Sequence, residues 1–93
     1  IHVTDADAVR SFRLTLDLLS ALRCLCPAEF RWLDPPYEYE TVKPPIDILY
    51  GNENLRRRLK TSESLTVEDL DLLTAVDEQA WKRRVQPFWI YPA

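Results

Sequence analysis

The first hydrophobic positions of the chain recur at helical spacing. The apolar series runs through Val9, Phe12, Leu16, Leu19, and Leu22 or Leu25. Residues three or four apart share one face of an α-helix, so this pattern predicts a helix from about residue 6 to residue 25. Thr4 and Asp7 have capping-box spacing at its start, and Pro27 marks its end.

A second long helix is predicted in the last third of the chain. Thr66 is a suitable N-cap with Asp69 three residues later, and Leu65 precedes the helix at the position of a hydrophobic staple. The helical pattern then continues, with one polar interruption, through Leu70, Leu73, Asp77, Ala80 and Trp81. Pro87 closes the segment, and the spacing places the side chain of Trp81 in the core.

Three other segments have the composition of β-strands. Residues 37–42 alternate aromatic and charged side chains, which favours a strand with one polar and one aromatic face. Residues 1–3 are typical of a strand, and residues 88–91 could pair beside either of these segments. Residues 30–33 are also rich in large apolar side chains and could form a short strand or an irregular aromatic cap over the core.

Prolines and the single glycine punctuate the middle of the chain. Pro45 suits the first turn of a helix, Asp47 favours the positive end of the helix dipole, and Gly51 suits a left-handed stop. These signals predict a short helix over residues 46–50. Asn52 can then cap a further helix.

These elements together predict an α+β domain. Two long helices pack on a small antiparallel sheet, with short helical turns between them. The 93 residues, 46% of them hydrophobic, fit one domain with one modest core. Because the chain contains no Met and opens on residues of strand character, we expect it to be a piece of a longer protein.

Charge and hydropathy argue against two kinds of partner. The net charge is −3, and the basic residues form short clusters at 56–58 and 82–84 within acidic helical stretches. A nucleic-acid-binding surface normally carries a basic excess along one face, so no nucleic-acid partner is expected. No apolar run approaches the roughly 20 residues that span a bilayer, so no membrane span is expected.

Residues 34–47 concentrate carboxylates, tyrosines and prolines, which favours a binding surface on a rigid loop. On a strand, Glu38 and Glu40 would share one face, with Cα atoms about 6.6 Å apart. Glycosidase carboxyl groups lie about 5 to 9.5 Å apart, but two neighbours on one strand cannot straddle a sugar. Both are therefore solvated acids, or one of them contacts a ligand. Tyr37 and Tyr39 could stack on a sugar ring.

No sequence pattern indicates metal, cofactor or nucleophile chemistry. His2 is the only histidine, and no Ser or Cys is convincingly placed to complete a triad with it. On a helix, Cys24 and Cys26 would point roughly 200° apart and could not bind one metal together. No catalytic residue, metal or cofactor is therefore expected within this chain.

Four stretches of the chain carry a family resemblance: Ile1-His2-Val3-Thr4-Asp5, Phe30-Arg31-Trp32, Pro35-Pro36-Tyr37-Glu38-Tyr39-Glu40 and Pro45-Ile46-Asp47-Ile48-Leu49-Tyr50-Gly51. In these stretches the chain resembles the C-terminal part of the bacterial exo-β-N-acetylmuramidase family, formerly catalogued as a domain of unknown function. The resemblance covers essentially all 93 residues in order. The third and fourth stretches are fairly specific as a pair.

The resemblance implies a glycoside hydrolase in which a Rossmann-like N-terminal domain and this smaller domain enclose a cleft. Such enzymes remove terminal β-linked N-acetylmuramic acid from peptidoglycan fragments, and many are exported from the bacterial cell. The catalytic carboxylates are expected in the larger domain. Residues 1–93 would then be a single C-terminal accessory domain, inactive alone, that forms one wall of the cleft.

The same resemblance implies which residues bind substrate. Tyr37, Glu38, Tyr39 and Glu40 would line or support the cleft, with Asp47 bracing the neighbouring turn. The expected partners are the N-terminal catalytic domain and peptidoglycan fragments, with a homo-oligomer as a further possibility.

Two other functions stay open. The chain could be a non-catalytic interaction or structural domain that docks on its partner domain or self-associates, which predicts dimers or aggregation. It could also be a saccharide-binding accessory domain with weak sugar affinity and no catalysis.

Overall fold

The computed structural model describes residues 1–60 and 64–91. Its elements, in chain order, are α1 (Ser11–Leu25), α2 (Pro45–Tyr50), α3 (Asn54–Arg58), α4 (Val67–Leu73), α5 (Glu78–Val85) and the 3-10 helix η1 (Gln86–Phe88). The described residues contain no β-strand, although an isolated antiparallel bridge pairs Tyr37 with Glu40. The domain is therefore all-α, and the predicted α+β class with a small sheet is wrong.

The predicted strands do not form, because none of them has a partner strand among the described residues. Residues 37–42 alternate like a strand, but the prolines on both sides lack N–H donors, and the chain turns back on itself at residues 38 and 39. Residues 1–3 and 89–91 are exposed and pair with no strand in the described part of the chain. Residues 30–33 form an irregular aromatic cap, in which Phe30 packs edge-on to Trp32 with ring centroids 4.9 Å apart.

α1 is the first long helix that the sequence predicts, but it begins later than expected. It starts at Ser11 rather than near residue 6, and it ends at Leu25, two residues before Pro27. The carboxylate of Asp5 accepts hydrogen bonds from the backbone N–H groups two and three residues ahead, at 3.0 and 3.4 Å. These bonds hold a turn before the helix, so the predicted capping role of Thr4 is wrong.

The second predicted helix is two separate helices. α4 opens with the predicted capping box: Thr66 accepts from the Asp69 N–H at 3.1 Å, and the Asp69 carboxylate accepts from the Thr66 N–H at 2.9 Å. α4 then ends at Leu73. Asp77 caps the next helix by accepting from the Ala80 N–H at 2.7 Å. The polar interruption in the sequence therefore starts a new helix.

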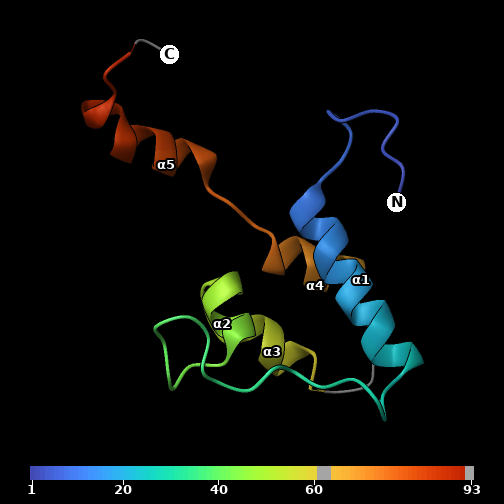
Figure 1. Ribbon diagram of the computed structural model, residues 1–93. Helices are drawn as coiled ribbons and strands as arrows, with labels where there is room; N and C mark the ends of the chain where they lie inside the picture. The colour runs from blue at the N-terminus through green and yellow to red at the C-terminus, as the bar shows by residue number, and fades with distance from the viewer. Residues whose placement is uncertain (61–63, 92–93) are drawn as a thin grey trace.

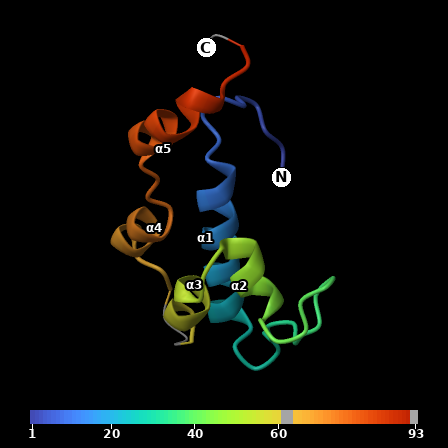
Figure 2. The ribbon, with the colours of Figure 1, turned by 90° about the vertical axis from the view of Figure 1, so that its left-hand side faces the viewer.

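α5 and η1 form an arm that extends beyond α4 (Figures 1 and 2). The main packing of α5 is with η1, its neighbour in the chain. Trp81 is 59% exposed, so its predicted core position is wrong, and Trp89 is also exposed, at 44%. The radius of gyration is 16.4 Å, whereas a compact chain of this length has about 12 Å.

The core is small and lies between α1 and the α2–α4 segment (Figure 1). Its buried members are Leu16, Leu55, Leu59, Leu65 and Leu70. Five partly buried side chains pack around them: Leu19, Trp32, Ile46, Tyr50 and Leu73. The buried hydroxyl of Ser20 accepts a hydrogen bond from the Leu65 N–H at 2.8 Å, which ties α1 to the segment that leads into α4. This core fixes α2 and the loop before it, where the candidate site lies.

Candidate functional site

The segment that the sequence singles out folds into a tight turn. The Tyr37 N–H donates to the Glu40 carbonyl at 2.9 Å, and the Glu40 N–H donates back to the Tyr37 carbonyl at 3.0 Å. Glu38 and Tyr39 form the tip, and Glu38 has the positive φ of 51° that the first residue of a two-residue hairpin loop requires. The peptide bond between residues 35 and 36 is cis. The turn holds the side chain of Tyr39 fully exposed.

Glu38 and Glu40 have different surroundings, and they do not share a strand face as predicted. One carboxylate oxygen of Glu40 accepts hydrogen bonds from the N–H groups of Val42 and Lys43, at 2.7 and 3.1 Å. These bonds, led by that from Val42, lower the pKa of Glu40 because they stabilise its charged form. Glu38 is exposed and forms no hydrogen bond or ion pair in the described part of the chain. Glu40 therefore braces the loop, whereas Glu38 is accessible to a ligand.

Asp47, in the first turn of α2, is bound by Arg56 of α3. The Nε of Arg56 donates to both carboxylate oxygens at 2.8 and 3.0 Å, and a terminal guanidinium nitrogen donates at 2.7 Å. The hydrogen bonds from Arg56 lower the pKa of Asp47, and the same pairing raises the pKa of Arg56. The carboxylate of Asp47 therefore joins α2 to α3 instead of facing solvent.

A pocket of about 370 Å³ lies beside this ion pair. It is lined by Lys43, Asp47, Gly51, Asn52 and Glu53. Gly51 ends α2 with a φ of 101°, the left-handed stop that the sequence predicts. Because Glu40 binds the Lys43 N–H, the turn at residues 37–40 is connected directly to the rim of this pocket.

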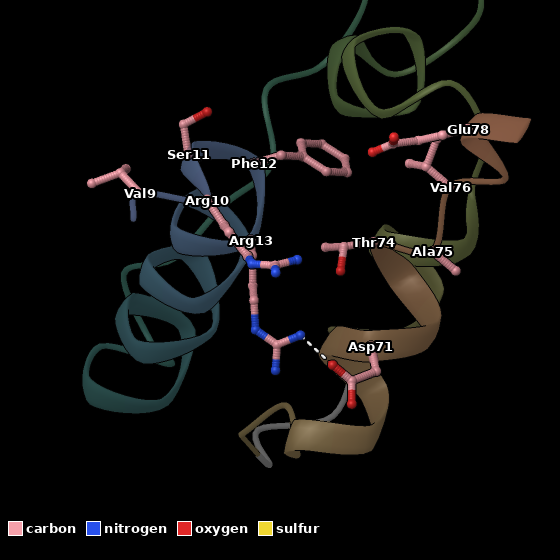
Figure 3. A pocket seen from close by; sticks show the side chains of 10 residues that line it. All are labelled: Val9, Arg10, Ser11, Phe12, Arg13, Asp71, Thr74, Ala75, Val76 and Glu78. Carbon is pink, nitrogen blue, oxygen red and sulfur yellow. Dashed lines mark hydrogen bonds and ion pairs between the residues drawn. The ribbon is translucent and has the colours of Figure 1, made fainter. Parts of the chain in front are cut away.

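A larger pocket, which no sequence motif predicted, lies between the start of α1 and the link from α4 to α5 (Figure 3). Its volume is about 530 Å³. Arg13 forms an ion pair with Asp71 across it. Arg10 also lines it, and its guanidinium group has no hydrogen-bond or ion-pair partner among the described residues. Two arginines three residues apart at the start of a helix are the sequence signal that could have indicated this pocket.

Phe12 and Tyr50 connect this pocket to α2. Their rings stack with centroids 5.9 Å apart and an interplanar angle of 17°. The hydroxyl of Tyr50 donates to the Leu73 carbonyl at 2.8 Å. Burial raises the pKa of Tyr50 above its ordinary value, because it disfavours the charged phenolate. The pair fixes α1, α2 and α4 relative to one another.

The described residues include no group of three or more His, Cys, Asp or Glu side chains placed to hold a metal ion. The Cys24 sulfur lies 3.3 Å from the Ser64 hydroxyl, and Cys26 is exposed. None of the described helices is both long enough and apolar enough to cross a membrane. An exposed tyrosine beside a carboxylate, and an arginine in a pocket, are groups suited to binding a polar ligand.

Comparison with known families gives a match over nearly the whole chain. Residues 1–91 match the family described as "Exo-beta-N-acetylmuramidase NamZ, C-terminal". No curated protein and no solved structure matches the chain. The matched residues include all four stretches in which the sequence resembles this family.

Proposed function

The chain belongs to the family of C-terminal domains of the exo-β-N-acetylmuramidase NamZ, and on this basis we propose that it forms one wall of a sugar-binding cleft. It would be the accessory domain of a bacterial, peptidoglycan-processing glycoside hydrolase. A Rossmann-like N-terminal domain forms the other wall and carries the catalytic carboxylates. The parent enzyme is exported and acts on peptidoglycan fragments.

The observation that carries this proposal is the exposed ring of Tyr39 at the tip of a fixed turn. An aromatic ring that packs against nothing in its own domain is available to stack on the apolar face of a pyranose. Glu38, beside it, can accept hydrogen bonds from sugar hydroxyls, because its carboxylate is exposed and unpaired in the described part of the chain. The turn therefore offers both kinds of contact that sugar recognition uses.

The other three candidate residues support the turn. Tyr37 forms its hydrogen-bonded base with Glu40, and the Glu40 carboxylate holds the following backbone. Asp47 fixes α2 through Arg56. A contact residue is effective when its neighbours hold it in place before the ligand arrives, since less conformational entropy is then lost on binding.

The test is a titration of an N-acetylmuramic-acid-containing disaccharide into the isotope-labelled domain, followed by backbone amide shifts. We expect saturable shifts that cluster at residues 35–51. Tyr39→Ala should abolish them, whereas Val42→Ala, also exposed and in the same loop, should retain them. Shifts of equal size in Tyr39→Ala, or none at millimolar ligand, would contradict a sugar site on this domain.

A second function is favoured by exposed apolar surface. Leu14, Leu18, Leu22 and Leu25 are 37–79% exposed and recur at helical spacing along α1. Contiguous apolar surface of this kind marks docking sites for protein partners. The domain would then dock on its N-terminal domain or self-associate. Light scattering coupled to size-exclusion chromatography tests self-association, and a monomer at all concentrations would contradict it.

A further inference from the structure

We propose that the pocket between α1 and the α4–α5 link binds a ligand that carries a carboxylate, with Arg10 as its charged contact. The pocket volume of about 530 Å³ falls within the roughly 300–1,000 Å³ of typical small-molecule sites. The guanidinium groups of Arg10 and Arg13 both point from α1 into it (Figure 3). This site is separate from the turn at residues 37–40.

The charges around the pocket leave Arg10 without a counter-ion. Arg13 is paired with Asp71, and the Glu78 carboxylate lies 3.9 Å from the ammonium group of Lys82. Arg10 has no ion pair in the described part of the chain. The lining as a whole is balanced, with Arg10 and Arg13 against Asp71 and Glu78, so the relevant charge is the unpaired guanidinium of Arg10 and not a net excess of positive charge. The guanidinium of Arg10 is therefore available to pair with a negatively charged group of a ligand.

The α1 and α4 sides of the pocket are held in place without a ligand. Phe12 is stacked on Tyr50, and the Thr74 hydroxyl donates to the Leu70 carbonyl at 2.7 Å. Arg13 is fixed by its ion pair with Asp71. Apolar groups of Phe12, Ala75 and Val76 also line the pocket. It therefore suits a carboxylate attached to a small apolar group better than a bare inorganic ion.

The chemistry of an arginine favours this ligand class. The planar guanidinium can donate two parallel hydrogen bonds to one carboxylate. If the proposed function holds, the substrate offers one of two such carboxylates: the lactyl carboxylate where muramic acid carries no peptide, or a carboxylate of the peptide where one is joined to the lactyl group. The lactyl group places a methyl group beside its carboxyl carbon, which matches the mixed lining of the pocket.

The experiment compares three ligands by amide shifts on the 93-residue chain. N-acetylmuramic acid has the lactyl carboxylate, N-acetylglucosamine lacks it, and muramoyl dipeptide has its free carboxylate at the peptide end. We expect N-acetylmuramic acid to shift the amides of residues 9–13 and 71–78, and N-acetylglucosamine to leave them unchanged. Shifts at these residues by muramoyl dipeptide alone would also support the site and assign the peptide as its source of the carboxylate.

Two arginine variants make the test specific. Arg10→Gln should weaken binding at least about tenfold, because a hydrogen bond between charged groups is lost. Arg83→Gln, an exposed arginine on α5, should bind as the parent chain does. Unchanged affinity in Arg10→Gln, or equal shifts with both monosaccharides, would overturn the proposal.

The outcomes also separate this site from the proposed function. Shifts confined to residues 35–51 would overturn the arginine pocket and leave the sugar-contacting turn in place. Shifts confined to residues 9–13 and 71–78 would support the pocket and contradict the role of the turn. The absence of shifts with every ligand would overturn both.

Discussion

Arg10 occupies a position where helix chemistry favours the opposite charge. It is the N-cap residue of α1, and α1 has neither a side-chain cap nor an acidic residue in its first turn. The N-terminus of a helix carries partial positive charge and unpaired N–H groups, which a side-chain carboxylate stabilises and a guanidinium does not. Arg10 therefore does not stabilise the N-terminus of α1, but its guanidinium group is well placed to bind an anion.

Because a positive charge is unfavourable at the N-terminus of a helix, we expect a substitution of Arg10 to change the stability of the domain. Arg10→Asp should raise the free energy of unfolding by about 1 kcal/mol, because aspartate can cap the helix and match its dipole. The same substitution should abolish carboxylate binding in the adjacent pocket. Urea unfolding measures the first effect, with Arg10→Gln as the control that removes the charge without adding a carboxylate. An Arg10→Asp protein less stable than Arg10→Gln would contradict the prediction.

Glu38 and Glu40 show how adjacent residues of one type come to differ. Glu40 is committed to the backbone N–H groups of Val42 and Lys43, whereas Glu38 sits at the tip of the turn. The sequence left open whether either acid contacts a ligand. The turn makes Glu38 the better candidate, because its carboxylate has no competing partner among the described residues.

At the scale of elements, the carboxylate of Asp69 links α3 to α4. Its carboxylate accepts from the Thr66 N–H within the capping box of α4 and from the Arg58 guanidinium of α3, where the Nε contact is 2.8 Å. The hydrogen bond from Arg58, followed by that from Thr66, lowers the pKa of Asp69 well below its usual range. Asp69 therefore caps one helix and joins it to another.

The lowered pKa predicts how stability depends on pH. A carboxyl group whose pKa is lower in the folded state contributes stability above its unfolded pKa of about 4, and this contribution is lost as the pH falls. Asp69→Asn should therefore lower the melting temperature at neutral pH and reduce the further loss below about pH 4. Asp34→Asn, at an exposed loop position, is the matched control. Melting curves of equal pH dependence in the parent and Asp69→Asn would contradict this role.

At the scale of the whole molecule, the domain leaves much of its apolar surface uncovered. The arm of α5 and η1 stands apart from the core, and its side chains Trp81, Phe88 and Trp89 are 44–79% exposed. The extents of 51 × 37 × 25 Å describe an elongated chain. Such a shape suits a domain that packs against another protein surface.

For the whole molecule, we expect that the 93-residue chain alone does not hydrolyse a glycoside. Glycoside hydrolysis needs two carboxyl groups on either side of the scissile bond. In the candidate site, Glu40 is bound to the backbone and Asp47 to Arg56. Glu53 is paired with Arg57 at 2.7 Å, which leaves Glu38 without a second unpaired acid. A chromogenic N-acetylmuramide should therefore not be hydrolysed above background, with the parent enzyme as the positive control. Robust hydrolysis by the purified chain would contradict this prediction.

The sequence by itself determined the local features and the family. The capping box at Thr66, the left-handed stop at Gly51 and the first turn of α2 at Pro45 follow from residues within a few positions of one another. Such signals are reliable because their hydrogen bonds and backbone angles are set by near neighbours. The family was equally accessible, since it rests on the order of short motifs along the chain.

Only the tertiary structure decided which residues distant in sequence contact one another. Alternation at residues 37–42 is compatible with a strand, but a strand also needs a partner, and the chain between its prolines pairs with itself instead. Helical spacing at Trp81 predicts an apolar face, but burial needs a second surface, and α5 packs mainly on η1. Arg10 and Asp71 line one pocket because α1 and α4 pack together. Contacts between residues distant in sequence depend on packing, which periodicity does not encode.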